Sequence, residues 1–252
     1  MIYIRSLLAN IFVYGTILLG CITTSIVGIF SRKITIPIWN RFFMPASMFF
    51  LRVLGGIKIE IRGREFMKQS GAIYAMKHES ALETYCMSTY LTKLAFVLKK
   101  ELTYIPIFGW AQYFYGMIPV DRSAGGAALK KMTKAAQDRV SQGRPIIIFP
   151  EGTRKKPGSP TDYKPGVTFL YQNLKLPVIP VATNTGLFWP KNSFLRYPGT
   201  VTIEFLPPIE PGLDKKEFLK NLEDAIESKC AELNSEVVTK NPEAKKRMYS
   251  AQ

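Results

Sequence analysis

The sequence predicts an α/β fold in which a mixed sheet is flanked by helices, preceded by an N-terminal hydrophobic membrane helix or hairpin. Two observations support this prediction. Short apolar runs alternate with amphipathic stretches over most of the chain, whereas the first 55 residues hold two long apolar stretches. We therefore divide the chain into a membrane-anchoring segment (1–55), an α/β domain (56–238) and a basic tail (239–252) that is expected to be disordered.

The N-terminal segment contains two apolar stretches. Leu7 to Phe30 carries no charge over about 24 residues, which is long enough to cross a ~30 Å hydrocarbon layer as a helix. Its length and the lack of a small-residue cleavage site argue against a signal peptide. Ile34 to Leu54 is interrupted by proline and arginine and rich in aromatics, which is typical of an interfacial segment. The first stretch could cross the membrane, with the basic residues that follow it in the cytoplasm. Alternatively, both stretches form a hairpin in one leaflet, or the first is a buried soluble helix.

After Gly55-Gly56, the hydrophobic pattern indicates alternating strands and helices. Short apolar runs predict strands at 57–61, 72–76, 94–98, 113–120, 145–149, 176–182 and 201–206. Amphipathic patterns predict helices after residue 80, at about 126–142, after residue 166 and at about 214–236. This alternation is what places the chain in the α/β class.

Charge and composition limit the possible functions. Lys and Arg number 34 against 19 Asp and Glu, a net charge of +15, which predicts an anionic partner: nucleic acid, an anionic membrane surface or a phosphorylated substrate. No nucleic-acid-binding motif accompanies the charge, so we expect no nucleic-acid partner. The three scattered cysteines and single histidine argue for a reducing compartment and against a metal site. The sequence also lacks the motifs of serine hydrolases and of P-loop nucleotide hydrolases.

The histidine, His78, follows the strand predicted at 72–76, and a predicted helix follows it. Ser80 stands at the expected N-cap of that helix, with Glu83 three residues later, as in a capping box. Five residues of helix turn by about 140°, so His78 can meet Glu83 only from the turn before the helix. In that case Glu83 would fix the imidazole tautomer, and the other ring nitrogen could take a proton from a substrate hydroxyl. The alternatives are a satisfied, partly buried histidine and a glutamate that only caps its helix.

Two further strand ends carry charged residues. Arg122 follows the strand predicted at 113–120, and Glu151 with Arg154 follows the strand at 145–149. Ligands of open α/β sheets gather at the carboxyl ends of strands, so these groups and His78 are expected to share one crevice. Two guanidiniums suit a phosphate, because their planar forks bind its oxygens bidentately. Solvated loop arginines and a salt-bridged Glu151 are the alternative interpretation.

Four motifs in this order resemble the glycerolipid acyltransferase family, and within it the bacterial 1-acyl-sn-glycerol-3-phosphate acyltransferases. They are K-H-E-S-A-L-E (77–83), G-M-I-P-V-D-R (116–122), F-P-E-G-T-R (149–154) and L-P-V-I-P-V (176–181). The resemblance implies transfer of an acyl group from acyl-CoA or acyl-carrier protein to the hydroxyl of lysophosphatidate, giving phosphatidic acid. It further implies no metal or cofactor, and a location at the inner (cytoplasmic) membrane among its lipids. Another acceptor, such as glycerol-3-phosphate or another lysolipid, and a non-catalytic lipid-binding protein of the same fold are the alternatives.

The resemblance also assigns roles to residues of the motifs. His78 would be the general base and Glu83 its orienting partner. Pro180 of the fourth motif would lie on the acyl-donor side. The phosphoglycerol head would be held by Lys100, Arg122, Glu151, Gly152, Thr153 and Arg154. The chain departs from the family pattern at two positions, because Glu83 stands where an aspartate is usual and Lys77 where an asparagine is usual.

Overall fold

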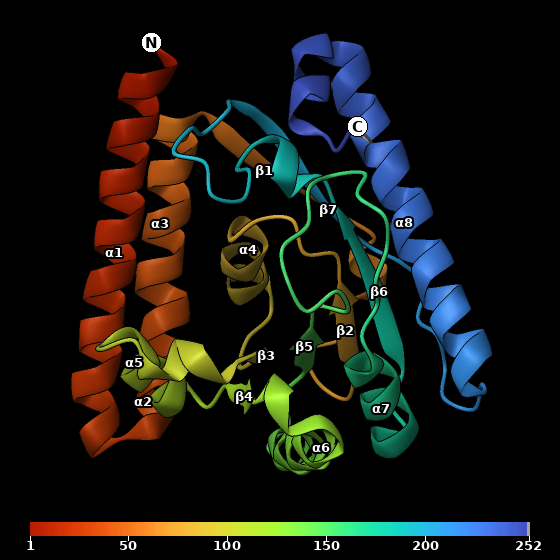
Figure 1. Cartoon of the computed structure of the whole chain (residues 1–252). Helices are drawn as coiled ribbons and strands as arrows, with labels where there is room; N and C mark the ends of the chain where they lie inside the picture. Colours follow the sequence, from red (N-terminus) through yellow and green to blue (C-terminus); the bar gives the residue numbers. More distant parts are fainter. Residues whose placement is uncertain (251–252) are drawn as a thin grey trace.

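A seven-stranded mixed sheet lies at the centre of the chain in this computed structural model, which describes residues 1–250 (Figure 1). The strand order is β1-β7-β6-β2-β5-β3-β4. The five strands from β6 to β4 are mutually parallel, whereas β7 runs antiparallel to β6 and carries β1 alongside it. The strands are β1 (Ile57–Arg62), β2 (Ile73–Met76), β3 (Ala95–Lys99), β4 (Ile118–Val120), β5 (Ile146–Ile148), β6 (Val178–Thr183) and β7 (Gly199–Phe205). The carboxyl ends of the parallel strands therefore meet at one edge, and the predicted mixed α/β sheet is confirmed.

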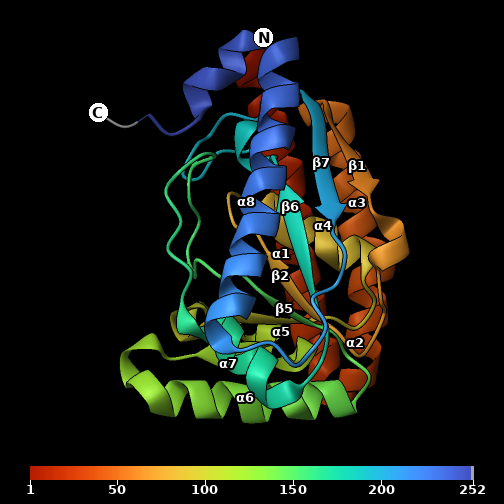
Figure 2. The same cartoon turned by 90° about the vertical axis from the view of Figure 1, so that its right-hand side faces the viewer.

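Helices cover both faces of the sheet (Figures 1 and 2). One face carries α1 (Ile2–Phe30), α2 (Arg32–Ile38), α3 (Met44–Phe50), α4 (Leu82–Tyr90) and α5 (Phe108–Tyr115). The other carries α6 (Gly125–Ser141), α7 (Pro165–Leu174) and α8 (Lys215–Lys240). Each face has its own hydrophobic cluster, because successive residues of a strand point to opposite sides.

The alternation along β2 decides which way the following residues point. Tyr74 and Met76 belong to the cluster under α4, and Ile73 and Ala75 to the cluster under α8. The segment 77–78 continues this alternation, with one side chain directed to α8 and the next to α4. The side chain of His78, the candidate base, therefore lies on the same side of the sheet as the N-terminal helices.

The N-terminal segment forms a helical hairpin beside the sheet. Helix α1 contacts the α/β domain along its length: Ser6 Oγ accepts from the Arg196 backbone at 2.8 Å, Asn10 donates to the Phe194 carbonyl at 2.8 Å, and Ser25 donates to the Ile107 carbonyl at 3.2 Å. It is also the one helix in the described chain long and apolar enough to cross a membrane. The chain returns through α2 and α3 with π-helical turns at residues 39–43 and 51–55.

The strand predicted at 113–120 is wrong for most of its length. Residues Phe108–Tyr115 form helix α5, and only Ile118–Val120 is a strand. Aromatic residues favour strands, but here they pack on α1, where Gly28 leaves room that a Cβ would fill by colliding with Phe114. Gly116, in the left-handed conformation (φ +83°), then ends the helix. The other predicted strands are all present, with ends shifted by two residues or fewer.

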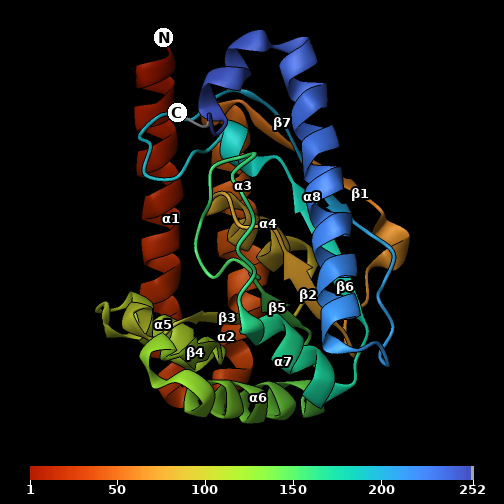
Figure 3. The same cartoon turned by 45° about the vertical axis from the view of Figure 1, so that its right-hand side comes forward.

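The disorder predicted for the tail at 239–252 is wrong for residues 239–250. Helix α8 extends to Lys240, and a 3₁₀ segment (Pro242–Arg247) folds back over the domain (Figure 3). The Arg247 guanidinium stacks 4.1 Å from the Tyr197 ring centroid, and the Tyr249 backbone donates to the Pro157 carbonyl at 2.8 Å. Basic residues can pack in this way because a guanidinium stacks on aromatic faces without losing its charge. Residues 251–252 lie outside the described part of the chain.

Candidate active site

His78 lies in the turn between β2 and α4, and Glu83 lies in the first turn of α4. The Glu83 Oε1 atom is 3.0 Å from Nδ1 of His78, and the Glu83 side chain is fully buried. The two side chains therefore meet in the one geometry that their spacing allows, with the glutamate reaching back from the helix. A carboxylate only accepts hydrogen bonds, so Nδ1 carries the proton and Nε2 presents its lone pair.

Glu83 is held by more than the histidine. Its Oε1 also accepts from the backbone N–H groups of Glu79 and Ser80, each at 2.7 Å, and its Oε2 accepts from the Thr185 hydroxyl at 2.9 Å. The bond from Ser80 is one half of the predicted capping box. Glu83 thus caps its helix and orients His78 at the same time.

An aromatic side chain packs against one face of the His78 imidazole. The Phe149 ring stacks on His78 with a centroid distance of 3.9 Å and an interplanar angle of 18°. The His78 side chain keeps 17% of its surface exposed, so the stack leaves part of the ring open to a substrate. Sequence reasoning did not single out Phe149 as a site residue. Its position at the end of the buried run that leads into the third motif was the available signal.

Arg122 meets the third motif across the sheet edge. It begins a short turn after β4, and its guanidinium lies against Gly152, where a Cβ would come within 3.3 Å of the guanidinium carbon. Gly152 also has a left-handed backbone (φ +65°), a conformation that favours glycine, and an added Cβ would have to displace the Arg122 guanidinium slightly. The strand ends after β4 and β5 therefore converge, and the Lys155 backbone donates to the His78 carbonyl at 2.8 Å, which joins β2 to the same crevice.

The cationic side chains that follow these strands fall into two groups. Within residues 1–250, Arg122 and Arg154 have no carboxylate at ion-pair distance, so both guanidiniums are available to an anion. Lys100, in contrast, pairs with Asp121 at 3.0 Å. The Ser123 hydroxyl and Lys100 lower the pKa of Asp121 to about 2. Lys100 therefore stabilises the turn that carries Arg122, and its ammonium is already ion-paired.

Two residues with implied site roles do not line the open crevice. The Glu151 carboxylate is completely buried and contacts the His78 backbone N–H and Lys77 Nζ, each at 3.3 Å, so it cannot touch a head group. Pro180 is buried within β6, opposite Ala75 of β2. Thr153 is half-buried in the loop beside Gly152. No group of three ligating side chains suited to a metal ion occurs in the described chain.

Comparisons with known proteins identify similar chains. A family model described as "Acyltransferase" matches residues 58–184. The chain is 34% identical to a Pseudomonas aeruginosa protein named 1-acyl-sn-glycerol-3-phosphate acyltransferase, over 91% of this chain and 87% of that protein. It is 28% identical to the human 1-acyl-sn-glycerol-3-phosphate acyltransferase alpha, over 63% of this chain and 57% of that one.

A solved structure shares the fold. The crystal structure of the 1-acyl-sn-glycerophosphate (LPA) acyltransferase PlsC from Thermotoga maritima superposes with a TM-score of 0.75 at 22% identity. The match covers 92% of this chain and 98% of the other. It therefore includes the N-terminal helices as well as the sheet.

Proposed function

Because this chain belongs to the acyltransferase family, we propose that it acylates lysophosphatidate, taking a fatty acyl group from acyl-CoA or an acyl-carrier protein and giving phosphatidic acid. One observation carries the proposal: His78, oriented by Glu83 at 3.0 Å, is joined through the Lys155 backbone to the loop that carries Gly152 and Arg154, and the Arg122 guanidinium lies against Gly152. The names of the relatives support this acceptor.

The chemistry follows from the geometry of His78. Nε2 takes the proton of the acceptor hydroxyl while the hydroxyl oxygen attacks the thioester carbonyl. The new C–O ester bond forms as the C–S bond breaks, and the imidazolium returns the proton to the departing thiolate. Glu83 stabilises the imidazolium and keeps the ring in place.

Arg154 and Arg122 bind the phosphate of the acceptor in this proposal. Replacing Arg154 by lysine should raise the KM for lysophosphatidate by about 10-fold with a smaller change in kcat, because a point charge replaces a bidentate fork. The measurement is steady-state acyl transfer with varied lysophosphatidate at saturating acyl-CoA. Arg64→Lys, on the short turn after β1, is the matched control and should leave both constants unchanged. An unchanged KM in the Arg154 variant would remove this residue from the phosphate site.

The outward face of α1 supplies a membrane-binding surface. Its large apolar side chains are exposed, including Leu19 (60%), Ile26 (55%) and Phe30 (85%), while the inward face packs on the α/β domain. A helix packed along one side cannot be surrounded by lipid, so we propose that it lies in one leaflet. The crevice then faces the same membrane, on the cytoplasmic side. The buried free thiols suit that reducing compartment.

The double variant Leu19→Lys/Ile26→Lys tests this surface. The two positions are seven residues apart and share a helix face, so the two charges should lower binding to vesicles by about 10-fold or more. Flotation with phosphatidylglycerol–phosphatidylcholine vesicles measures the bound fraction, and thermal unfolding should stay unchanged. Gln172→Lys/Asn221→Lys, on exposed positions of α7 and α8, adds the same charge as a control. Equal flotation of both double variants would contradict the assignment.

The whole proposal is tested by acyl transfer with the purified chain. Labelled oleoyl-CoA is offered with lysophosphatidate, glycerol-3-phosphate or lysophosphatidylcholine, and acyl-carrier protein replaces CoA in a parallel series. Transfer to lysophosphatidate alone is the expected result. Transfer only to another acceptor would reassign the substrate, and no transfer from either donor would leave a non-catalytic lipid-binding protein.

A further inference from the structure

The residue before the candidate base is a buried lysine. Lys77 follows β2, points to the α8 side of the sheet and is 1% exposed. A buried ammonium is costly unless it is paired. Neither its burial nor its partners could be inferred from its place in the first motif, because the partners lie elsewhere in the chain.

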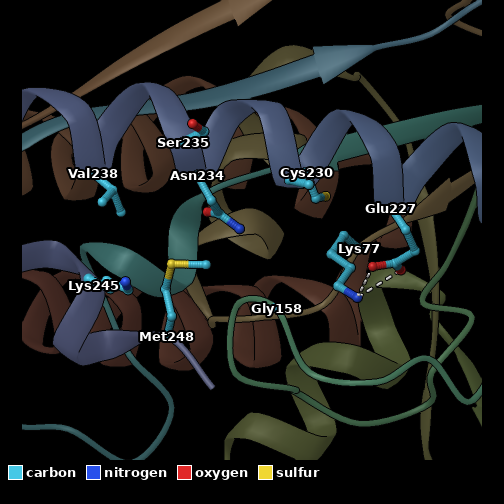
Figure 4. A pocket seen from close by; sticks show the side chains of 10 residues that line it. Lys77, Gly158, Glu227, Cys230, Asn234, Ser235, Val238, Lys245 and Met248 are labelled. Carbon is cyan, nitrogen blue, oxygen red and sulfur yellow. Dashed lines mark hydrogen bonds and ion pairs between the residues drawn. The ribbon is translucent and has the colours of Figure 1, made fainter. Parts of the chain in front are cut away.

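Lys77 Nζ is paired on two sides. It lies 2.7 and 2.8 Å from the two carboxylate oxygens of Glu227 on α8, and 3.3 Å from Glu151 Oε1. Figure 4 shows the side chains of Lys77 and Glu227 meeting at one end of a cavity of about 280 Å³ beneath α8. The Tyr163 hydroxyl donates to the same glutamate at 2.8 Å, which fixes the outer end of the pair.

The inner end of the network reaches the backbone of His78. Glu151 Oε1 forms an ion pair with Lys77 Nζ at 3.3 Å and accepts a hydrogen bond from the His78 N–H, also at 3.3 Å. Within residues 1–250, Lys77 is the one cation at ion-pair distance from Glu151. Burial raises the pKa of Glu151, and the Lys77 ammonium opposes that rise. Burial alone would lower the pKa of Lys77, but Glu151 and Glu227 raise it above its usual value, so the ammonium stays charged.

We propose that Lys77 and Glu227 are positioning residues for the acyl-transfer reaction: Lys77 keeps Glu151 an ionised acceptor for the His78 backbone, and Glu227 anchors Lys77 to α8. Through this pair, helix α8, which carries Glu227 150 residues after Lys77, helps to position His78. The proposal deepens the proposed function and rests on His78 as the base. It also explains what Lys77 does at a position where the family usually has asparagine.

The charges around Glu151 set the direction of the expected pH effect. Lys77, His78 and Glu79 face it from the segment after β2, and Tyr163 faces it from the loop before α7. Glu227 on α8 faces it across Lys77 Nζ. Burial raises the pKa of Glu79 well above its usual value, so this side chain adds little negative charge. Removing the ammonium therefore leaves Glu151 easier to protonate, whereas removing the Glu227 charge leaves it harder to protonate.

The test compares Lys77→Met and Glu227→Gln with the unchanged full-length enzyme, measuring kcat and KM from about pH 5.5 to 9. Lys77→Met should lower kcat at neutral pH by about 10-fold with little change in either KM, since no substrate contact is lost. The acidic limb of its kcat–pH profile should move to higher pH by about one unit, because without the ammonium Glu151 becomes ionised only at that higher pH. Glu227→Gln should move the limb the opposite way, with a loss of kcat below about 3-fold.

Lys229→Met is the matched control, because it removes an ion-paired lysine from α8 that does not touch the network. A purely structural pair would lower the melting temperature in both variants and leave the shape of both pH profiles unchanged, which would overturn the proposal. Should Lys77→Met fail to fold, the Glu227→Gln profile decides alone. An active His78→Ala enzyme would refute the base assignment itself, whatever the Lys77 profile, so the two failures are distinguishable.

Discussion

The His78→Ala enzyme is expected to lose about 10³-fold in kcat or more, because general-base catalysis by a positioned histidine contributes a factor of this order. The imidazole is the one group in the crevice that combines a fixed orientation, a free Nε2 and partial exposure. Without it the acceptor hydroxyl must lose its proton to water during attack on the thioester. Initial rates of phosphatidate formation from labelled oleoyl-CoA measure the loss.

Binding and folding should survive this substitution. The head group contacts Arg122 and Arg154 in our proposal, so the KM for lysophosphatidate should change by less than about 3-fold. Vesicle flotation should also be unchanged, because the substitution leaves the exposed apolar side chains of α1 intact. Rates like those of the unchanged enzyme would end the assignment of His78 as the base, whereas loss of flotation together with activity would indicate misfolding.

Local patterns were sufficient to predict the geometry in which His78 and Glu83 could meet. A buried run, a turn and a capping residue are all close in sequence, and the five-residue spacing allowed only one geometry for contact. Most strands were predictable for the same reason, because burial on both faces produces short apolar runs.

Features that depend on distant partners were not predictable. The helix at Phe108–Tyr115 follows from packing against α1, and its own residues favour a strand. The third motif suggested that Glu151 binds the substrate, yet its carboxylate is buried and paired with Lys77. No spacing in the sequence links Lys77 to Glu227, which becomes its neighbour only when α8 packs on the sheet.

Glu83→Asp is expected to lower kcat by about 10²-fold, although aspartate is the usual residue at this position in the family. Shortening the side chain by one methylene withdraws the carboxylate by about 1.5 Å. It cannot then keep the 3.0 Å contact with His78 Nδ1 and the bonds to the Glu79 and Ser80 backbone together. A displacement near 1 Å in a catalytic contact costs about this factor. The turn here is built around the longer side chain, so the family residue is not interchangeable with it.

We expect Glu83→Asp to lower kcat by more than its loss of stability can explain. A buried donor left without its acceptor costs about 1–3 kcal/mol, which lowers the melting temperature by several degrees. Assays well below that temperature separate the two effects, and Glu217→Asp, in the exposed first turn of α8, serves as the control. Since Glu83 acts through the imidazole, adding Glu83→Asp to His78→Ala should cost little further activity. Additive losses in the double variant would show that Glu83 acts independently of His78, and a fully active Glu83→Asp enzyme would show that the turn adjusts to the shorter side chain.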